Sequence, residues 1–329
     1  MHSRAIVFGV ICAVCVLGGG AWVTIAALSG STTTSDAKVA VAGGEKLDVW
    51  GKLLVRAVDK GDDRLNGRVT LVSLGQHPSK AAAGGMACER LYVAAGRGLC
   101  EYVAASGVDY RVKIFDSRYR TIYEEELPGV PSRARVSPSG RYGSITTFVT
   151  GDSYATPGAF STRTLIYDMR AGKQIANLEQ FSVKRDGETI DAPDFNFWGA
   201  TFAKDDDTFY ATLGTRGKRY LVKGSLRAKQ LTVIHENVEC PSLSPDETRI
   251  AYKRRVGAPD DWRLHVLDLA SGRDVELAET RSIDDQAEWF DDDTVLYGHD
   301  GSVWAVRADG TGSPERVLAR AASPATIRG

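Results

Sequence analysis

The sequence lacks an excess of charge of either sign. It has 41 Lys and Arg residues against 42 Asp and Glu residues in a chain of 329. Proteins that recognise nucleic acid usually present a clear basic surface. A balanced chain has no global field of this kind, so the composition disfavours nucleic acid as a partner.

The sequence also lacks the short motifs of the common enzyme classes. It has no G-x-S-x-G elbow, no H-E-x-x-H, no phosphate-binding loop and no dinucleotide-binding glycine pattern. The five histidines are scattered, and none stands at metal-ligand spacing to another His or Cys. We therefore predict a protein that is not an enzyme and that has neither metal nor other cofactor.

Long apolar runs are absent except at the N-terminus. Residues 5–28 carry no charged side chain and are numerous enough to cross a hydrocarbon layer of about 30 Å. The run is longer than the apolar region of a typical secretory signal. Because Arg4 precedes it, the positive-inside tendency keeps residues 1–4 in the cytoplasm. We predict a transmembrane anchor at 5–28, a tether at 29–50 and an extracytoplasmic domain at 51–329, held at a bacterial cytoplasmic membrane. A cleaved signal, which would give a secreted protein, is the alternative.

Cysteine is scarce, with five residues in the chain. Cys88 and Cys100 flank two apolar strand-like runs around a glycine-containing turn, so the two thiols can meet across an antiparallel pair. A disulfide here would stabilise the fold by about 3 kcal/mol and would suit an oxidising compartment. Two small buried residues are the alternative. Cys240 has no obvious partner and is interpreted as a small core residue.

After residue 28 the chain has no convincing amphipathic helix and many short strand signals. The strands recur in one order, most clearly in units that begin at Cys240 and Gln286. In each unit a strand runs into a Pro/Asp turn, a second and third strand follow, and a fourth ends the unit. Weaker copies begin near Arg133, Gly199 and Cys88. Successive starts lie about 36 to 66 residues apart, which brackets the length of a four-stranded propeller blade.

The N-terminal unit has no first strand of its own. Its runs LLVRAVDKGD, GRVTLVSL and HPSKAAAG supply only the second, third and fourth strands, whereas the final residues SPATIRG form a strand without a unit. Pairing the two would close the ring and cover an edge that otherwise invites aggregation. The sequence therefore predicts an all-β, six-bladed β-propeller closed by the C-terminal strand and preceded by one transmembrane helix.

The segment CPSLSPDETRIAYKRR, followed by RLHVLDLASG, resembles the repeat of TolB-like propellers, a family of PD40/WD40-like repeats. The motif residues are Pro241, Ser242, Ser244, Pro245 and Asp246. Turn chemistry accounts for all of them, because proline sets the turn and Ser or Asp hydrogen-bonds its own backbone. The resemblance implies six blades whose first strands line a channel, and a binding scaffold that contacts lipoproteins or peptides.

Two segments are longer than a tight hairpin needs, namely residues 150–162 and 185–197. Loops on a rigid scaffold often carry recognition, and aromatic side chains dominate binding hot spots. The aromatic candidates for a contact surface are Tyr154, Phe160, Phe195, Phe197 and Trp198. They could equally cover the core of their own blade. The acidic triplets at 205–207 and 291–293 are interpreted as solvated turns rather than a calcium site.

These observations predict a membrane-tethered, extracytoplasmic module that binds or scaffolds a protein or peptide. The alternatives are a lyase or glycosidase in the channel mouth, or a small-ligand binder on the same propeller. Two carboxylates about 5 to 9 Å apart in the mouth would favour a glycosidase. A bare or apolar mouth would favour binding.

Overall fold

The computed structural model describes residues 51–59, 61, 66–74, 80–149, 161–257 and 261–328. No helix among these residues is long and apolar enough to span a membrane. The predicted anchor at 5–28 and the tether lie outside the described residues. They remain predictions.

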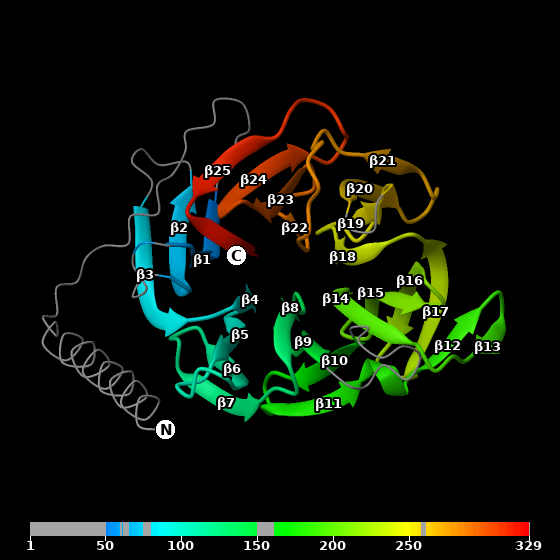
Figure 1. Cartoon of the computed structure of the whole chain (residues 1–329), viewed down its shortest axis with the longest axis horizontal. Coiled ribbons are helices and arrows are strands. Elements are labelled where there is room, and N and C mark those ends of the chain that lie inside the picture. Colours follow the sequence, from blue (N-terminus) through cyan, green and yellow to red (C-terminus); the bar gives the residue numbers. More distant parts are fainter. Residues whose placement is uncertain are drawn as a thin grey trace, which may run out of the picture. The chain divides into compact units, whose positions relative to one another are not determined.

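Six antiparallel sheets are arranged radially around a central axis, with one strand of each facing it (Figure 1). Blade 1 consists of β26 (Ala321–Ile327), β1 (Gly51–Ala57), β2 (Arg68–Leu74) and β3 (Lys80–Ala87). Blade 2 consists of β4 (Arg90–Ala94), β5 (Arg97–Val103), β6 (Tyr110–Asp116) and β7 (Thr121–Glu126). Blade 3 consists of β8 (Val130–Val136), β9 (Tyr142–Val149), β10 (Ser161–Asp168) and β11 (Lys173–Asn177).

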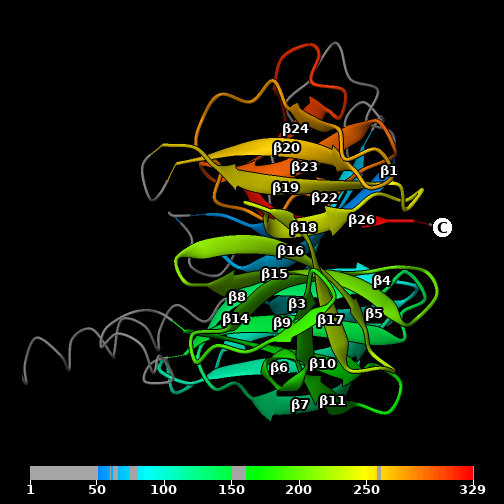
Figure 2. The ribbon, with the colours of Figure 1, turned by 90° about the vertical axis from the view of Figure 1, so that its right-hand side faces the viewer.

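The remaining blades follow in chain order. Blade 4 contains β14 (Asn196–Phe202), β15 (Thr208–Thr215), β16 (Lys218–Ser225) and β17 (Gln230–Glu236). Blade 5 contains β18 (Glu239–Leu243), β19 (Arg249–Arg255), β20 (Trp262–Asp268) and β21 (Asp274–Glu276). Blade 6 contains β22 (Glu288–Trp289), β23 (Thr294–His299), β24 (Ser302–Arg307) and β25 (Glu315–Ala319). Viewed from the side, the strands cross the thickness of the ring (Figure 2).

The C-terminal strand closes the ring, as the sequence predicts. β26 pairs antiparallel with β1, and Leu53 and Leu54 lie opposite Thr326 and Ala325. Without β26, the edge of β1 would face the channel with unpaired backbone groups. The closure confirms the six-bladed propeller and places both ends of the ring in one blade.

The hydrophobic core is divided among the seams between neighbouring blades. A propeller sheet is buried on both faces, so each pair of adjacent sheets encloses a cluster of apolar side chains. In the seam between blades 2 and 3, Leu99 packs in the same cluster as Ile145 and Leu165. Six such clusters are present among the described residues, one for each seam. This radial core excludes a two-sheet sandwich.

Side-chain hydrogen bonds build the turns after the first strands. The hydroxyl of Ser244 accepts a hydrogen bond from the backbone N–H of Arg249 at 2.9 Å and donates one to Asp246 at 2.5 Å. Glu247 follows with φ of 62°, in the left-handed region that Gly140 occupies in blade 3 with φ of 68°. Glutamate therefore stands where the repeat usually has glycine.

The acidic triplets form turns of the same kind. The Asp205 carboxylate accepts from the backbone N–H groups of Asp207 and Thr208 at 3.0 and 2.7 Å. Asp291 accepts from the backbone of Asp293 at 2.9 Å. These contacts are those of solvated Asp turns. No cluster of His, Cys, Asp or Glu that could hold a metal ion occurs within the described ranges.

Blade 4 is larger than the repeat predicts. Part of the segment interpreted as a long loop folds into a hairpin of β12 (Ser182–Arg185) and β13 (Glu188–Ile190). β12 pairs in parallel with β17 and extends this sheet to six strands. A short 3-10 helix, Leu178–Gln180, precedes the hairpin. The sequence did not indicate this pairing because the repeat contains no partner for a fifth strand.

The predicted disulfide is present between Cys88 and Cys100, with Cα atoms 5.4 Å apart. Its position differs in one respect from the prediction. Cys88 lies in the link between β3 and β4, and the residue opposite Cys100 in the strand pair is Leu91. The bridge therefore ties the connection between blades 1 and 2 to β5. Cys240 has a free, buried thiol.

Candidate functional site

The first strand of every blade places a polar residue in the lining of one cavity in the channel. We call this set the mouth ring. Its members are Tyr92, Arg135, Thr201, Ser242, Glu288 and Thr326. Arg135 and Ser242 each stand two residues before the turn serine of their repeat, so the repeat itself sets their place. The first strands thus bring together residues that are up to 234 positions apart in the sequence.

An ion pair across the channel forms the floor of the mouth. Arg135 of blade 3 donates from Nη1 to Oε2 of Glu288, which belongs to blade 6 on the opposite side of the ring (Figure 1). Only 5% of the Arg135 side chain and 2% of the Glu288 side chain are exposed. Arg135 also donates to the carbonyl of Ala287 at 2.7 Å and lies 4.4 Å from the centre of the Tyr92 ring.

Glu288 is saturated by donors from three other blades. Besides Arg135, it accepts from the Tyr92 hydroxyl at 3.0 Å and from the backbone N–H of Thr326 at 3.1 Å. Nη1 of Arg328 lies 3.6 Å from Oε1 of Glu288, the oxygen that also accepts from Thr326. Burial, and then the Glu288 charge, raise the pKa of Tyr92, so its phenol remains a donor at neutral pH. The floor is thus a hydrogen-bonded polar network that joins four blades through Glu288.

A cavity of about 400 Å³ opens above this floor. We call it the mouth cavity. Its walls include the apolar side chains of Phe202, Pro245 and Trp289. This volume lies within the range of ligand sites, about 300–1,000 Å³. The cavity can therefore accept a small ligand or a few residues of a partner.

Charged residues also line the mouth cavity. The Lys204 ammonium donates a hydrogen bond to the carbonyl of Pro245 at 2.5 Å. The backbone N–H of Lys204 donates to the Glu247 carboxylate, also at 2.5 Å. Arg328 has 42% of its side chain exposed. Glu247 and Glu288, the two carboxylates of the lining, both already accept hydrogen bonds, whereas the Lys204 ammonium has only a neutral acceptor. The lining as a whole favours an anionic group.

Below the mouth ring the channel narrows. Arg133 donates from Nε to the sulfur of Cys240 at 3.3 Å and from Nη2 to Asp284 at 3.2 Å. Lys253 donates to the same carboxylate at 2.5 Å. The space at this level, beside Arg133 and Asp285, is about 30 Å³, which suits about one water molecule. Tyr92 and Arg135 line both this space and the cavity above it.

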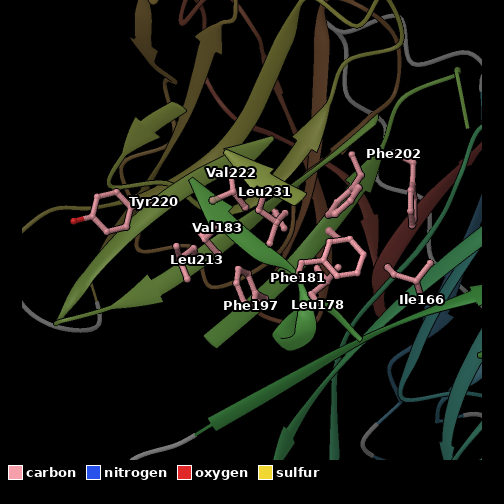
Figure 3. Close-up of a cluster of buried hydrophobic side chains, with 13 residues drawn as sticks. Ile166, Leu178, Phe181, Val183, Phe197, Phe202, Leu213, Tyr220, Val222 and Leu231 are labelled. Atoms are coloured by element: carbon pink, nitrogen blue, oxygen red, sulfur yellow. The ribbon is translucent and has the colours of Figure 1, made fainter. Parts of the chain in front are cut away.

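Three of the aromatic residues proposed from the sequence, Phe195, Phe197 and Trp198, are among the described residues, and none of them lines the mouth cavity. Phe197 is 1% exposed and packs between blades 3 and 4 beside Leu178 and Phe181 (Figure 3). Phe195 packs edge-on against Phe197, with ring centres 6.2 Å apart. This is the alternative in which the aromatic residues cover the core of their own blade.

The remaining aromatic candidates are Trp198, Tyr154 and Phe160. Trp198 is 7% exposed, and the Arg219 guanidinium lies 5.2 Å from the centre of its ring. Tyr154 and Phe160 lie outside the described residues, so their role as contact residues stays a prediction. Phe197 and Trp198 are thus buried, whereas Phe195 is half-buried.

Sequence reasoning missed the charged members of the mouth ring. The repeat motif indicates turn residues, whereas the channel-lining residue stands two positions before each turn. That position holds Arg135 in the copy near Arg133 and Glu288 in the copy at Gln286. The repeat alignment could have identified both residues as channel-lining. It could not show that they pair with each other.

A buried carboxyl group lies in the wall of blade 2. Glu101 is fully buried, and neither of its oxygens has a hydrogen-bond partner among the residues that the structure describes. Burial raises the pKa of Glu101 well above its ordinary value, although the guanidinium groups of Arg90 and Arg133 oppose the shift. At a pH between the unfolded and the folded pKa of this carboxyl group, Glu101 thus keeps a proton in the folded protein that it has lost in the unfolded chain.

This shift predicts a pH-dependent effect of Glu101→Gln. A raised carboxyl pKa makes stability fall as the pH rises from the unfolded value, about 4.3, through the folded value. We expect the variant to match the wild type near pH 4 and to exceed it by about 1–3 kcal/mol at pH 8. Urea unfolding across this range measures the difference. Glu124→Gln is the control, because its hydrogen bond with Tyr102 lowers the pKa of Glu124 and should give no gain at high pH. A pH-independent difference for Glu101→Gln would contradict the prediction.

Solved structures with a similar fold include TolB proteins. The structure of TolB from Acinetobacter baumannii matches with a TM-score of 0.59 at 14% identity, covering 88% of this chain and 68% of that chain. A putative TolB from Agrobacterium tumefaciens gives a TM-score of 0.50 at 10% identity, covering 84% and 92% of the two chains. A chain of a nidogen/laminin complex gives 0.56 at 12% identity, covering 84% and 98%. No protein-family model matches the sequence, and no curated protein is similar to it.

The fold and the mouth ring define a closed six-bladed β-propeller whose channel is crossed by an ion pair beneath an open mouth. At these identities the similarity concerns the fold alone. The fold is that of TolB-like propellers, which confirms the resemblance seen in the repeats.

Proposed function

We propose that this chain is a membrane-tethered, extracytoplasmic propeller that binds a protein partner at the mouth of its channel and catalyses no reaction. The observation that carries the proposal is the Arg135–Glu288 floor beneath the mouth cavity, in which hydrogen-bond donors already occupy the Glu288 carboxylate. General acid–base catalysis needs a group that can take up or release a proton next to the substrate. Glu288 instead accepts hydrogen bonds from three donors, namely Tyr92, Arg135 and the backbone of Thr326, and Glu247 accepts one from a backbone N–H.

Two further observations support the proposal. A disulfide is typical of an oxidising compartment, and the apolar run at 5–28 suits an anchor that leaves the propeller outside. Propellers also serve as rigid scaffolds, and the similarly folded nidogen/laminin structure is itself a protein complex.

Site-specific photo-crosslinking tests the mouth as the binding surface. We would replace Lys204, at the mouth, with p-benzoylphenylalanine and irradiate intact cells. Lys223, exposed on β16 of the same blade, is the matched control. We expect an adduct of discrete mass from position 204, none from position 223, and loss of the adduct when Arg328→Glu is added. Adducts from both positions, or from neither, would exclude a partner at the mouth.

The same cells test the proposed location. Trypsin, added at a concentration that digests the folded propeller in lysed cells, should also digest it in intact spheroplasts. Protection of the propeller until the cells are lysed would contradict an extracytoplasmic domain.

A further inference from the structure

A second cavity adjoins the mouth cavity at the seam between blades 1 and 2. It has a volume of about 190 Å³, and its lining includes Leu54, Phe115, Tyr119 and Ile327. We call it the seam cavity. Ala94, Ala95 and Arg328 line both cavities, so the two lie next to each other at these residues.

The seam cavity has an apolar floor, and apolar side chains flank its opening together with Arg97. Leu54 and Phe115 are each 2% exposed and form its buried part. Tyr119 and Ile327 keep 45% and 40% of their surface exposed at its opening. The Tyr119 ring stacks on Phe115 with centres 5.8 Å apart and planes 15° apart. Large apolar side chains that flank a hollow are typical of a binding site, unlike single exposed residues.

The two cavities differ in the charged side chains that line them. Arg328 lies between them, and Lys204 lines the mouth cavity. Arg135 also lines the mouth cavity, and its buried Nε–H has no acceptor within the described part of the chain. Asp116, the acid of the seam cavity, is paired with Arg120 at 2.7 Å. A ligand that spans both cavities therefore meets a cationic region followed by an apolar one.

We propose that the two cavities together bind an extended peptide segment of a protein partner. The segment places a carboxylate in the mouth cavity, close to Arg328, and a large apolar side chain in the seam cavity. This inference rests on the proposed function and names its ligand. The seam cavity is smaller than most sites for whole small molecules, about 300–1,000 Å³, so it suits a single side chain. One peptide can fill both cavities, because an extended backbone advances by about 3.3 Å per residue and so carries its side chains into adjacent sites.

Selection from a random peptide library displayed on phage tests the proposal. The target is the full-length protein in detergent micelles. We expect enriched peptides to contain Asp, Glu or a free C-terminal carboxylate within about four residues of Leu, Ile, Met or Phe. Binding of a synthetic selected peptide is then measured by fluorescence anisotropy. Tyr119→Asn and Arg328→Gln should each weaken it about tenfold or more, as for central contacts in other interfaces.

The variants have matched controls. Asparagine at 119 retains the left-handed backbone that Tyr119 adopts with φ of 59° while removing its ring. Ile234→Ala, at a residue 42% exposed on β17, should leave binding unchanged. Arg254→Gln, whose side chain is also 42% exposed and ion-paired, should do the same. The peptide with its apolar residue replaced by Ala should bind wild type and Tyr119→Asn equally, because the contact is then already lost.

The outcomes separate the inference from the proposed function. Peptides that depend on Arg328 but not on Tyr119 would overturn the role of the seam cavity and leave the mouth as a binding site. Enrichment of peptides without an acidic and apolar pair, or no enrichment, would overturn the inference as a whole. The crosslink at position 204 decides independently whether a protein binds at the mouth.

Discussion

A chain that ends at Arg320 is expected to yield no soluble, protease-resistant propeller. The deletion removes β26, and β1 then loses its hydrogen-bonded neighbour on the channel side. Leu53 and Leu54, which are 0% and 2% exposed in the closed ring, would lie beside an open edge. Open edges with apolar side chains pair with other chains and aggregate. The soluble fraction after expression and the rate of limited proteolysis measure the effect.

A circular permutant distinguishes the loss of a strand from the loss of a terminus. In this variant residues 321–328 precede Gly51 through a short flexible linker, and the chain ends at Arg320. The permutant keeps β26 beside β1, so we expect it to be soluble and to melt close to the wild type. Aggregation of the permutant, or a stable truncated chain, would contradict closure by β26.

Arg135→Met is expected to lower the free energy of unfolding by about 3–5 kcal/mol. The substitution removes the cation from a floor in which Glu288 is 2% exposed, and leaves that carboxylate buried without its main partner. An uncompensated buried charge costs far more than the lost attraction alone. Urea denaturation, followed by tryptophan fluorescence, measures the change at neutral pH.

The double variant Arg135→Met with Glu288→Leu shows whether the cost comes from the unpaired charge. We expect it to recover most of the stability, because apolar residues often replace a buried ion pair at little cost. Arg254→Met is the surface control. Its pair with Asp274 is more exposed than the floor pair, with 42% of the Arg254 side chain and 18% of the Asp274 side chain accessible, so we expect a loss below about 1 kcal/mol. Additive losses in the double variant would exclude coupling across the channel.

The order of the strands could be predicted because each blade repeats its turn chemistry. Turns such as that at Ser244 are local, and their hydrogen bonds join residues five or fewer positions apart. The orphan strand at the C-terminus could be assigned to the first unit by simple completion of the repeat. The disulfide was also predicted correctly, since Cys88 and Cys100 are close in the sequence.

The aromatic candidates show where this reasoning ends. A loop rich in aromatic residues indicates either a contact surface or a covered core, and the choice depends on the neighbouring blade. Phe197 is buried because Leu178 and Phe181 of the preceding connection pack against it. Likewise, the hairpin of β12 and β13 depends on the free edge of β17, which no local pattern reveals.

The sequence by itself determined the propeller fold, because strand alternation, turn residues and the repeat act over short distances. Only the tertiary structure decided the site. Arg135 and Glu288 are 153 residues apart and meet because their blades face each other across the ring. The seam cavity likewise joins side chains from blades 1 and 2 that come from opposite ends of the chain. Contacts of this kind depend on ring closure, and closure is a property of the six sheets together.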